Sequence, residues 1–374
     1  MNAPVDISRS GIALDARLGI IDCDIHPFPR PGALARYLPE RWREHLTEYG
    51  QMTCSFYAGR GNYPRFQPYL SRRDSVPPDG GPPGSNVDFI REQLLDPYNI
   101  IYGVLEPLLG GNNSRNLDEA AALCAAMNEW QIAEYTDPEP RLRASILVPL
   151  DDPDAAVREI ERRAGDWRFC QVQVGGKTTE PIGRRRYWPI FEAVLKHGLS
   201  IGMHSGGTQA YAPSPGGFAQ FYVEDHQLGT HSVQSQITSL ILEGVFDVFP
   251  DLKIVMIEGG FGWVPQLGWR MDAHWTKMRS EVPTLRRKPS EYLKTNLWYA
   301  TQPVEEPERP DDLRQTFEWI GWDRMVYSSD YPHWDFDDPQ QAWRFQMTAE
   351  EKRGLLHDNA LAVYSFRSSS SAAS

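Results

Sequence analysis

Eight short runs of aliphatic and β-branched residues recur along the chain, separated by longer segments with helical periodicity. This alternation is typical of βα units, in which each strand of a parallel sheet is followed by a helix. The runs occupy residues 19–24, 100–106, 144–150, 169–175, 200–206, 253–259, 297–302 and 325–330. The helices are expected at 117–135, 153–164, 187–197, 232–248, 263–279 and 311–319. Eight such units predict an α/β protein, a (β/α)8 barrel that forms one domain over residues 19–366.

Two connections are too long for plain βα loops. Residues 27–99 follow the first run and are dense in proline and glycine, and residues 206–231 follow the fifth. Loops of this length in a compact domain are usually functional. Because all strands of a barrel end at one face, we expect two lid insertions over the same mouth. Residues 1–18 are predicted to be an N-terminal extension, and the serine-rich residues 367–374 a disordered tail.

The composition narrows the class of partner. A formal net charge of -12 at pH 7 disfavours nucleic acid and anionic membranes, which are bound through clustered Lys and Arg. No apolar run approaches the roughly 20 residues of a membrane span, and the N-terminus lacks the pattern of a secretory signal. We therefore expect a cytoplasmic protein with a small-molecule substrate. For its assembly we expect a homo-oligomer, with the dimer as default, or a complex with a homologous subunit.

Carboxylates and imidazoles stand where the predicted strands end. In the first run, Asp24 and His26 alternate with Ile21, Cys23 and Ile25. Alternate side chains of a strand share a face, so we expect the polar pair to point into the barrel and the apolar set to face the helices outside. Burying charge without a partner is costly. These side chains therefore indicate a bound cation or proton partners.

The same pattern recurs at other strand ends. His204 closes the fifth run and Asp330 closes the eighth. In the sixth run Glu258 alternates with Val255 and Ile257, so we expect it to point inward as well. Active sites of barrels lie at the C-terminal ends of the strands, where these residues would converge. Imidazole nitrogen combined with carboxylate oxygen suits Zn²⁺, Mn²⁺ or Fe²⁺.

Three motifs together resemble the amidohydrolase superfamily. They are the D-x-H from Asp24 to His26, the M-H-S-G around His204 and the Y-S-S-D-Y-P-H around Asp330. The chain is most similar to the second family, which is related to aminocarboxymuconate semialdehyde decarboxylase. The resemblance implies that Asp24, His26, His204 and Asp330 bind the metal, and that Asp330 can also help to move a proton.

The sequence departs from that family at the sixth strand, where Glu258 stands in place of the usual histidine. Glu258 could act as a general base, bind a second metal, or only pair with Arg270 on the following helix. Of two histidines near the end of the second insertion, we favour His231 over His226 as a ligand or proton carrier, because His231 is nearer to the expected helix start. Adding Glu258 and His231 to the ligand set would suit a dinuclear iron or iron–manganese centre, and the chain is similar to a dinuclear non-haem monooxygenase branch of the superfamily.

Four functions remain open from the sequence. The first is hydrolysis of a small carboxylated or cyclic organic substrate by a metal-activated water, with Glu258, Asp330 and His231 as catalytic residues. The second is oxygen-dependent hydroxylation at a dinuclear iron-containing centre, and the third is non-oxidative decarboxylation, against which the missing histidine counts. The fourth is a silent barrel that partners an active homologue. Arg72 and Arg73 of the first insertion are candidates for binding a substrate carboxylate.

Overall fold

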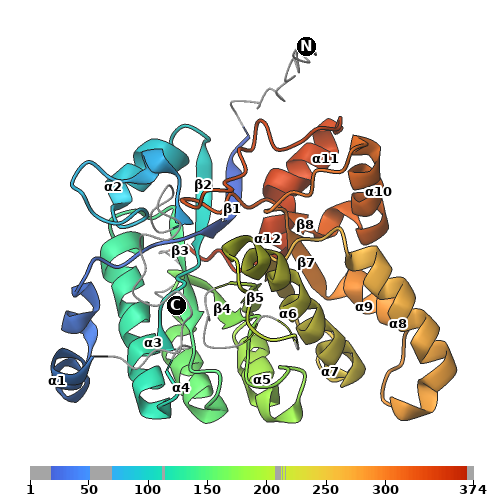
Figure 1. Cartoon of the computed structure of the whole chain (residues 1–374), viewed down its shortest axis with the longest axis horizontal. Coiled ribbons are helices and arrows are strands. Elements are labelled where there is room, and N and C mark those ends of the chain that lie inside the picture. Colours follow the sequence, from blue (N-terminus) through green and yellow to red (C-terminus); the bar gives the residue numbers. More distant parts are fainter. Residues whose placement is uncertain are drawn as a thin grey trace.

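The computed structural model describes residues 18–50, 70–111, 114–206, 212, 214 and 216–368. Its centre is a parallel sheet of eight strands in the order of the sequence (Figure 1). The strands are β1 Ile20–Ile25, β2 Ile100–Leu105, β3 Leu142–Leu147, β4 Phe169–Gly175, β5 Ser200–His204, β6 Ile254–Ile257, β7 Leu297–Ala300 and β8 Met325–Val326. The segment after β8 joins β1, because the amide of Cys23 donates to the carbonyl of Tyr327 and that of Asp330 to the carbonyl of Asp24. The predicted (β/α)8 barrel is confirmed.

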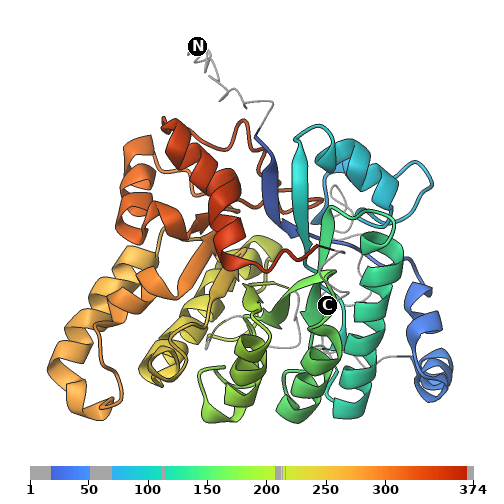
Figure 2. The same ribbon diagram turned by 180° about the vertical axis from the view of Figure 1, so that it is seen from behind.

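Helices surround the strands in both views (Figures 1 and 2). They are α1 Glu40–Tyr49, α2 Val87–Ile90, α3 Leu117–Gln131, α4 Pro153–Arg163, α5 Trp188–Lys196, α6 Tyr222–Leu242, α7 Val245–Val248, α8 Val264–Met278, α9 Pro289–Thr295, α10 Pro310–Ile320, α11 Ala349–Arg353 and α12 Asn359–Val363. Polar caps begin several of them. The Asn116 side chain accepts from two backbone amides at the start of α3, and Asp152 accepts from Ala155 at the start of α4.

One predicted helix boundary is wrong in a way that affects the site. The helix expected from residue 232 begins ten residues earlier, because the Glu224 carboxylate accepts the amides of Gln220 and Phe221 and caps the first turn. Gly229, which falls within the predicted insertion, sits inside α6 where the helix passes close to Ser205. The end of the second insertion is therefore part of a regular helix.

The interior of the barrel holds a separate apolar cluster. It is formed by Ile21, Cys23, Val104, Cys170, Val255, Ile257, Trp298, Ala300 and Val326 together with Ala360, Val363 and Tyr364. Only the inside of a barrel brings side chains of six strands together. The expectation that Ile21 and Cys23 face the outer helices is therefore wrong. The register of β1 against β2 shifts between Asp22 and Ile25, so simple alternation does not hold along this strand.

The C-terminal segment closes this interior cluster from one end. In Figure 2 the chain leaves α12 and crosses the sheet toward the C-terminus. The Phe366 ring stacks on Tyr102 of β2 at 4.5 Å, and the Arg367 guanidinium donates to the carbonyls of Ala164 and His197. Arg367 is thus held in place, contrary to the predicted disordered tail, of which residues 369–374 lie outside the described part of the chain. Residues 1–17 of the predicted N-terminal extension do too.

Both long insertions reach the loop that follows β8. The amide of Trp334 donates to Leu70, that of Arg72 donates to Pro332, and the Trp334 indole donates to the Tyr222 hydroxyl. The middle of each insertion, residues 51–69 and 207–211, is not described. Within the described residues, no helix combines the length and the apolar character needed to cross a membrane.

Candidate metal centre

Four of the predicted ligands lie together at the C-terminal ends of the strands. Asp24 is in β1 and His26 directly follows it, His204 is the last residue of β5, and Asp330 lies in the loop after β8. All four side chains are buried. Ligand atoms of Asp24, His26 and His204 lie within 4.8 Å of one another, and so do those of His26, Asp330 and His333. His26 belongs to both groups and stands at their centre.

A backbone oxygen sets the orientation of the His26 ring. Its Nδ1 donates to the carbonyl of Glu106, at the end of β2, over 2.7 Å. The other nitrogen, Nε2, therefore faces the carboxylates, 3.1 Å from Oδ1 of Asp24 and 2.8 Å from Oδ1 of Asp330. A hydrogen bond that fixes the tautomer in this way is typical of metal-binding histidines. The carbonyl of His26 is in turn packed against Gly84, where a Cβ atom would overlap it.

Asp330 is held by two neighbours besides His26. Gln302, which follows β7, donates to its Oδ2 over 2.9 Å, and Nδ1 of His333 lies 2.5 Å from its Oδ1. The backbone of Asp330 has a φ of 61°, which is unusual for a residue with a side chain. Burial raises the pKa of this carboxyl well above its usual value, and the negative charges of Asp335 and Glu258 raise it further.

Glu258 reaches the cluster, but not by the alternation that the sequence suggested. Val255 and Ile257 belong to the interior cluster, while Ile254 and Met256 pack outside, so a straight strand would send Glu258 outward. Its φ of 53° turns the chain back at the end of β6. The carboxylate then enters the site, with Oε2 lying 2.9 Å from Nε2 of His204.

Of the two histidines near the end of the second insertion, the one beside Glu258 is His226 and not His231. Nε2 of His226 lies 3.7 Å from Oε1 of Glu258 and 3.1 Å from Oδ2 of Asp335. His231 is exposed and lines a groove between α6 and α8, together with Arg270. The structure therefore brings neither His231 nor Arg270 to the cluster. The buried stripe of α6 contains the signal that was missed, because counting back by helical turns from Val233 through Gly229 arrives at His226.

The charges around His226 and Glu258 depend on each other. Burial raises the pKa of Glu258, but the His204 and His226 imidazoles outweigh it and hold this pKa below its usual range. Burial lowers the pKa of His226, and Asp335 and Glu258 together outweigh it and raise this pKa to about 9. Asp335 is a site residue that sequence reasoning missed, because it lies in a loop with no strand or helix periodicity to mark it.

Of the two predicted carboxylate-binding arginines, Arg72 and Arg73, the first has other partners. Arg72 donates to the Asp74 carboxylate at 2.6 Å, and its guanidinium lies over the Phe336 ring.

The donor set fits a divalent cation. Both carboxylate oxygens of Asp24, Nε2 of His26 and Nε2 of His204 are buried without a hydrogen-bond partner among the described residues. In the described part of the chain, no lysine or arginine forms an ion pair with Asp24, Asp330 or Glu258. Buried carboxylates need a compensating charge, and mixed nitrogen and oxygen ligands suit Mn²⁺, Zn²⁺ or Fe²⁺. Asp24, His26, His204 and Asp330 are the residues that would hold such an ion.

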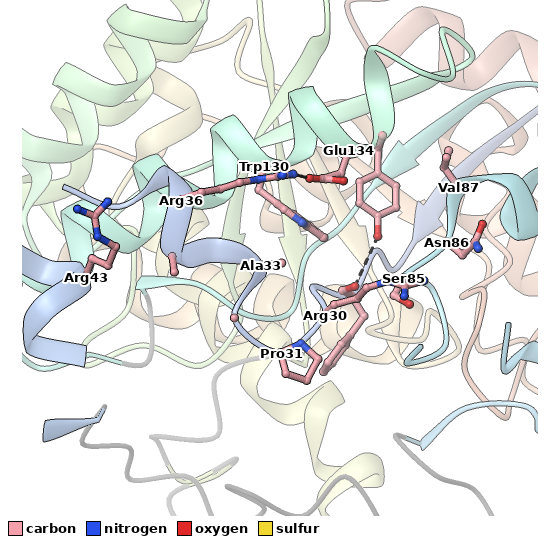
Figure 3. Close-up of a pocket in the computed structure, with 14 residues that line it drawn as sticks. Arg30, Pro31, Ala33, Arg36, Arg43, Ser85, Asn86, Val87, Trp130 and Glu134 are labelled. Atoms are coloured by element: carbon pink, nitrogen blue, oxygen red, sulfur yellow. Dashed lines mark hydrogen bonds and ion pairs between the residues drawn. The ribbon is translucent and has the colours of Figure 1, made fainter. Parts of the chain in front are cut away.

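A separate cavity of about 850 Å³ lies between the chain after β1, the start of α2 and the end of α3 (Figure 3). Arg30, Arg36 and Arg43 line it. Arg36 pairs with Glu134 and Arg30 with Asp79, so two of the three arginines are already neutralised. None of the cavity's lining residues belongs to the ligand cluster.

A family model described as amidohydrolase matches residues 21–366, nearly the whole of the barrel. The chain belongs to the amidohydrolase family. Among curated relatives of this amidohydrolase-family protein, gamma-resorcylate decarboxylase of Polaromonas sp. is 28% identical over 221 residues, which are 55% of this chain and 65% of the relative. The enzyme of the same name from Rhizobium radiobacter is 26% identical over 57% of this chain and 66% of its own. The match therefore spans just under two thirds of these relatives.

Solved structures agree on the fold. An amidohydrolase from Mycobacterium avium subsp. paratuberculosis is 22% identical with a TM-score of 0.70, covering 94% of this chain and 100% of its own. The dihydroxybenzoic acid decarboxylase of Polaromonas sp., with bound manganese and 2-nitroresorcinol as inhibitor, is 20% identical with a TM-score of 0.66, covering 92% of this chain and 96% of its own. The 5-carboxyvanillate decarboxylase of Novosphingobium aromaticivorans, also with manganese, is 18% identical with a TM-score of 0.68, covering 94% and 97%.

Proposed function

We propose that this amidohydrolase-family protein is a metal-dependent, non-oxidative decarboxylase of a small hydroxylated aromatic or similarly conjugated acid. The observation that carries the proposal is the buried cluster of Asp24, His26, His204 and Asp330, whose unsatisfied ligand atoms converge at the barrel mouth. The decarboxylases among its curated relatives direct the choice among the reactions that such a cluster supports. Hydrolysis, the reaction that the sequence favoured, becomes a less favoured alternative to decarboxylation.

The protein residues divide between holding the metal and moving the proton. When bound, the metal would act as a Lewis acid that orients the substrate carboxylate. Glu106 fixes His26 through its carbonyl, and Gln302 and His333 fix Asp330. In the reaction the bond between ring carbon and carboxylate breaks, its electron pair stays on the carbon, and a proton replaces the departing CO2. We assign that proton to Asp330 or to the pair of Glu258 and His226.

A second candidate is an oxygen-dependent hydroxylase with two metal ions. It is favoured by His226, Glu258 and Asp335, which add one imidazole and two carboxylates directly beside the first ligand set. Glu258 faces His204 with one oxygen and His226 with the other, as a carboxylate that bridges two ions would do.

One experiment separates these reactions. Anaerobically purified protein is analysed for metals by plasma mass spectrometry, loaded with Mn²⁺ and incubated with 2,6-dihydroxybenzoate and 5-carboxyvanillate. We expect about one equivalent of metal and release of CO2 without oxygen uptake. Two equivalents including iron, with oxygen consumed, would establish the hydroxylase instead. Hydrolysis of an ester, lactone or amide panel without CO2 release would establish the hydrolase.

The Asp24→Ala variant is the control for this experiment, because any metal or turnover that it retains does not come from the cluster. Protein that takes up no metal would favour the fourth alternative, a catalytically silent barrel that partners an active homologue. A homo-oligomer and a cytoplasmic location stay predictions.

A further inference from the structure

Three aromatic rings stand side by side at the edge of the ligand cluster. Tyr222 and His226 are one turn apart on α6, and Trp334 lies in the loop after β8. The ring centres of Tyr222 and His226 are 5.9 Å apart, those of His226 and Trp334 5.8 Å, and those of Tyr222 and Trp334 6.5 Å. We call these three residues the aromatic wall.

The polar atoms of these rings already contact one another or the carboxylates beside the metal ligands. The Trp334 indole donates to the Tyr222 hydroxyl over 2.8 Å, and Nε2 of His226 lies against Asp335 and Glu258. The backbone of Trp334 is fixed as well, since its amide donates to Leu70. The rings are therefore oriented before any ligand arrives, and a preorganised surface loses little entropy on binding.

The wall adjoins the metal ligands through His226. One oxygen of Glu258 faces His226 and the other faces His204. The residue before Trp334, His333, has its ring centre 4.3 Å from that of His26. The wall therefore lies within reach of a molecule whose carboxylate binds at the ligand cluster.

The exposure of the wall is unlike that of core aromatics. Trp334 is 42% exposed and the His226 side chain 25%, whereas the ligands beside them are buried. Aromatic faces bind other π-systems in offset or edge-to-face arrangements at these ring separations. A saturated ring of the same size has no π-system and presents axial hydrogens, so it gains less from this surface.

We propose that Tyr222, His226 and Trp334 bind the face of a planar conjugated substrate ring and make the enzyme select planar over saturated acids. The inference rests on the proposed function for the reaction, and the wall itself can be tested by binding alone. Trp334 provides the largest exposed face and is the residue to vary. Tyr222 and His226 complete the wall from α6.

The test compares Trp334→Leu, Trp334→Phe and the control Trp269→Leu. Trp269 is also highly exposed, at 60%, but lies on α8. Calorimetry on manganese-loaded protein measures the Kd of 2-nitrophenol and of cyclohexanol, and metal content is measured in parallel. For Trp334→Leu we expect about tenfold weaker binding of the planar probe, unchanged binding of the saturated one and unchanged metal content. Trp334→Phe keeps a ring and should restore most of the affinity, and Trp269→Leu should behave as wild type.

Equal effects on the two probes, or no binding of the planar probe to wild type, would overturn the inference. If the wild type binds the planar probe through Trp334 but releases no CO2 from any acid, the proposed reaction fails and the wall stands. If CO2 is released, the same variants should raise KM for planar acids with little change in kcat. A loss confined to kcat would show that Trp334 acts on the chemistry and not as a binding surface.

Discussion

Nε2 of His204 lies 2.9 Å from Oε2 of Glu258, across the ends of two neighbouring strands. The other nitrogen of His204 accepts the amide of Gly206 over 3.0 Å. The proton of a neutral His204 therefore sits on Nε2, the nitrogen that faces Glu258. A metal ion bound at Nε2 would take the place of this proton. The charge of Glu258 thus lies directly beside a candidate metal ligand.

Glu258→Gln keeps the size and removes the charge. We expect the variant to fold and to retain metal on the four cluster ligands, while kcat falls by about 100-fold or more, because the carboxylate that pairs with His226 in the proposed proton delivery is lost. Circular dichroism, metal analysis and steady-state kinetics check this. A kcat equal to that of wild type would show that Glu258 is only a structural partner of His204.

His226→Ala and His231→Ala form a matched pair on one helix. His226 contacts Glu258 and Asp335, whereas His231 is exposed. We expect His226→Ala to lower kcat/KM by at least about tenfold and His231→Ala to leave it within about twofold. A larger loss in His231→Ala than in His226→Ala would favour His231 as the functional histidine, as the sequence did, and would contradict the position of α6.

Gly84→Ala tests how the first insertion supports the metal centre from a distance in sequence. A Cβ atom at Gly84 would overlap the backbone oxygen of His26. Gly80 has the same positive φ of 76°, but no described residue lies within 4 Å of the position of its missing Cβ. Gly80→Ala is therefore a control that carries the backbone strain without the contact. We expect manganese affinity to drop by about tenfold or more in Gly84→Ala alone. Equal metal affinity in the two variants would mean that the contact has no influence on His26.

Glu139, which lies outside the metal centre, predicts that the folded state loses stability in acid. Burial raises its pKa, but hydrogen bonds from Arg141 and Arg91 outweigh burial and lower this pKa from 4.5 to about 2. A pKa lowered by folding stabilises the folded state above the unfolded value, and this contribution is lost as the pH falls toward 2.

For Glu139→Gln we expect a loss of about 1–2 kcal/mol in the free energy of unfolding at pH 7. The difference from wild type should shrink between about pH 5 and pH 2. Urea denaturation at several pH values measures it. A difference that stays constant over this range would exclude the ion pairs as its source.

The sequence was sufficient for the barrel because eight apolar runs with crossover helices leave few other solutions. It was also sufficient to place Asp24, His26, His204 and Asp330 together, since strand ends of a barrel meet at one face. It failed for Ile21 and Cys23, because a register shift in β1 reverses which side chains face inward. Period-two alternation carries no information about such a shift.

The remaining errors have three different causes. Glu258 reaches the site because its backbone is left-handed. Neither residue propensity nor hydrophobic pattern predicts a left-handed conformation for a residue other than glycine. His226 was passed over because the start of α6 depends on a cap from Glu224, and a shifted helix start changes which histidine faces the barrel. Asp335 and Gln302 lie in loops whose geometry is set by contacts with distant strands.

The joining of β1 to the segment after β8 has a consequence for biosynthesis. Chains emerge from the ribosome N-terminus first, so Asp24 and His26 are made long before Asp330. Until Tyr327 and Asp330 arrive to pair with Cys23 and Asp24, one edge of β1 has no neighbour and is open to the edge strand of another nascent chain. The full ligand set therefore exists only once this edge is covered, so formation of the metal centre and protection of the β1 edge depend on the same late-synthesised segment.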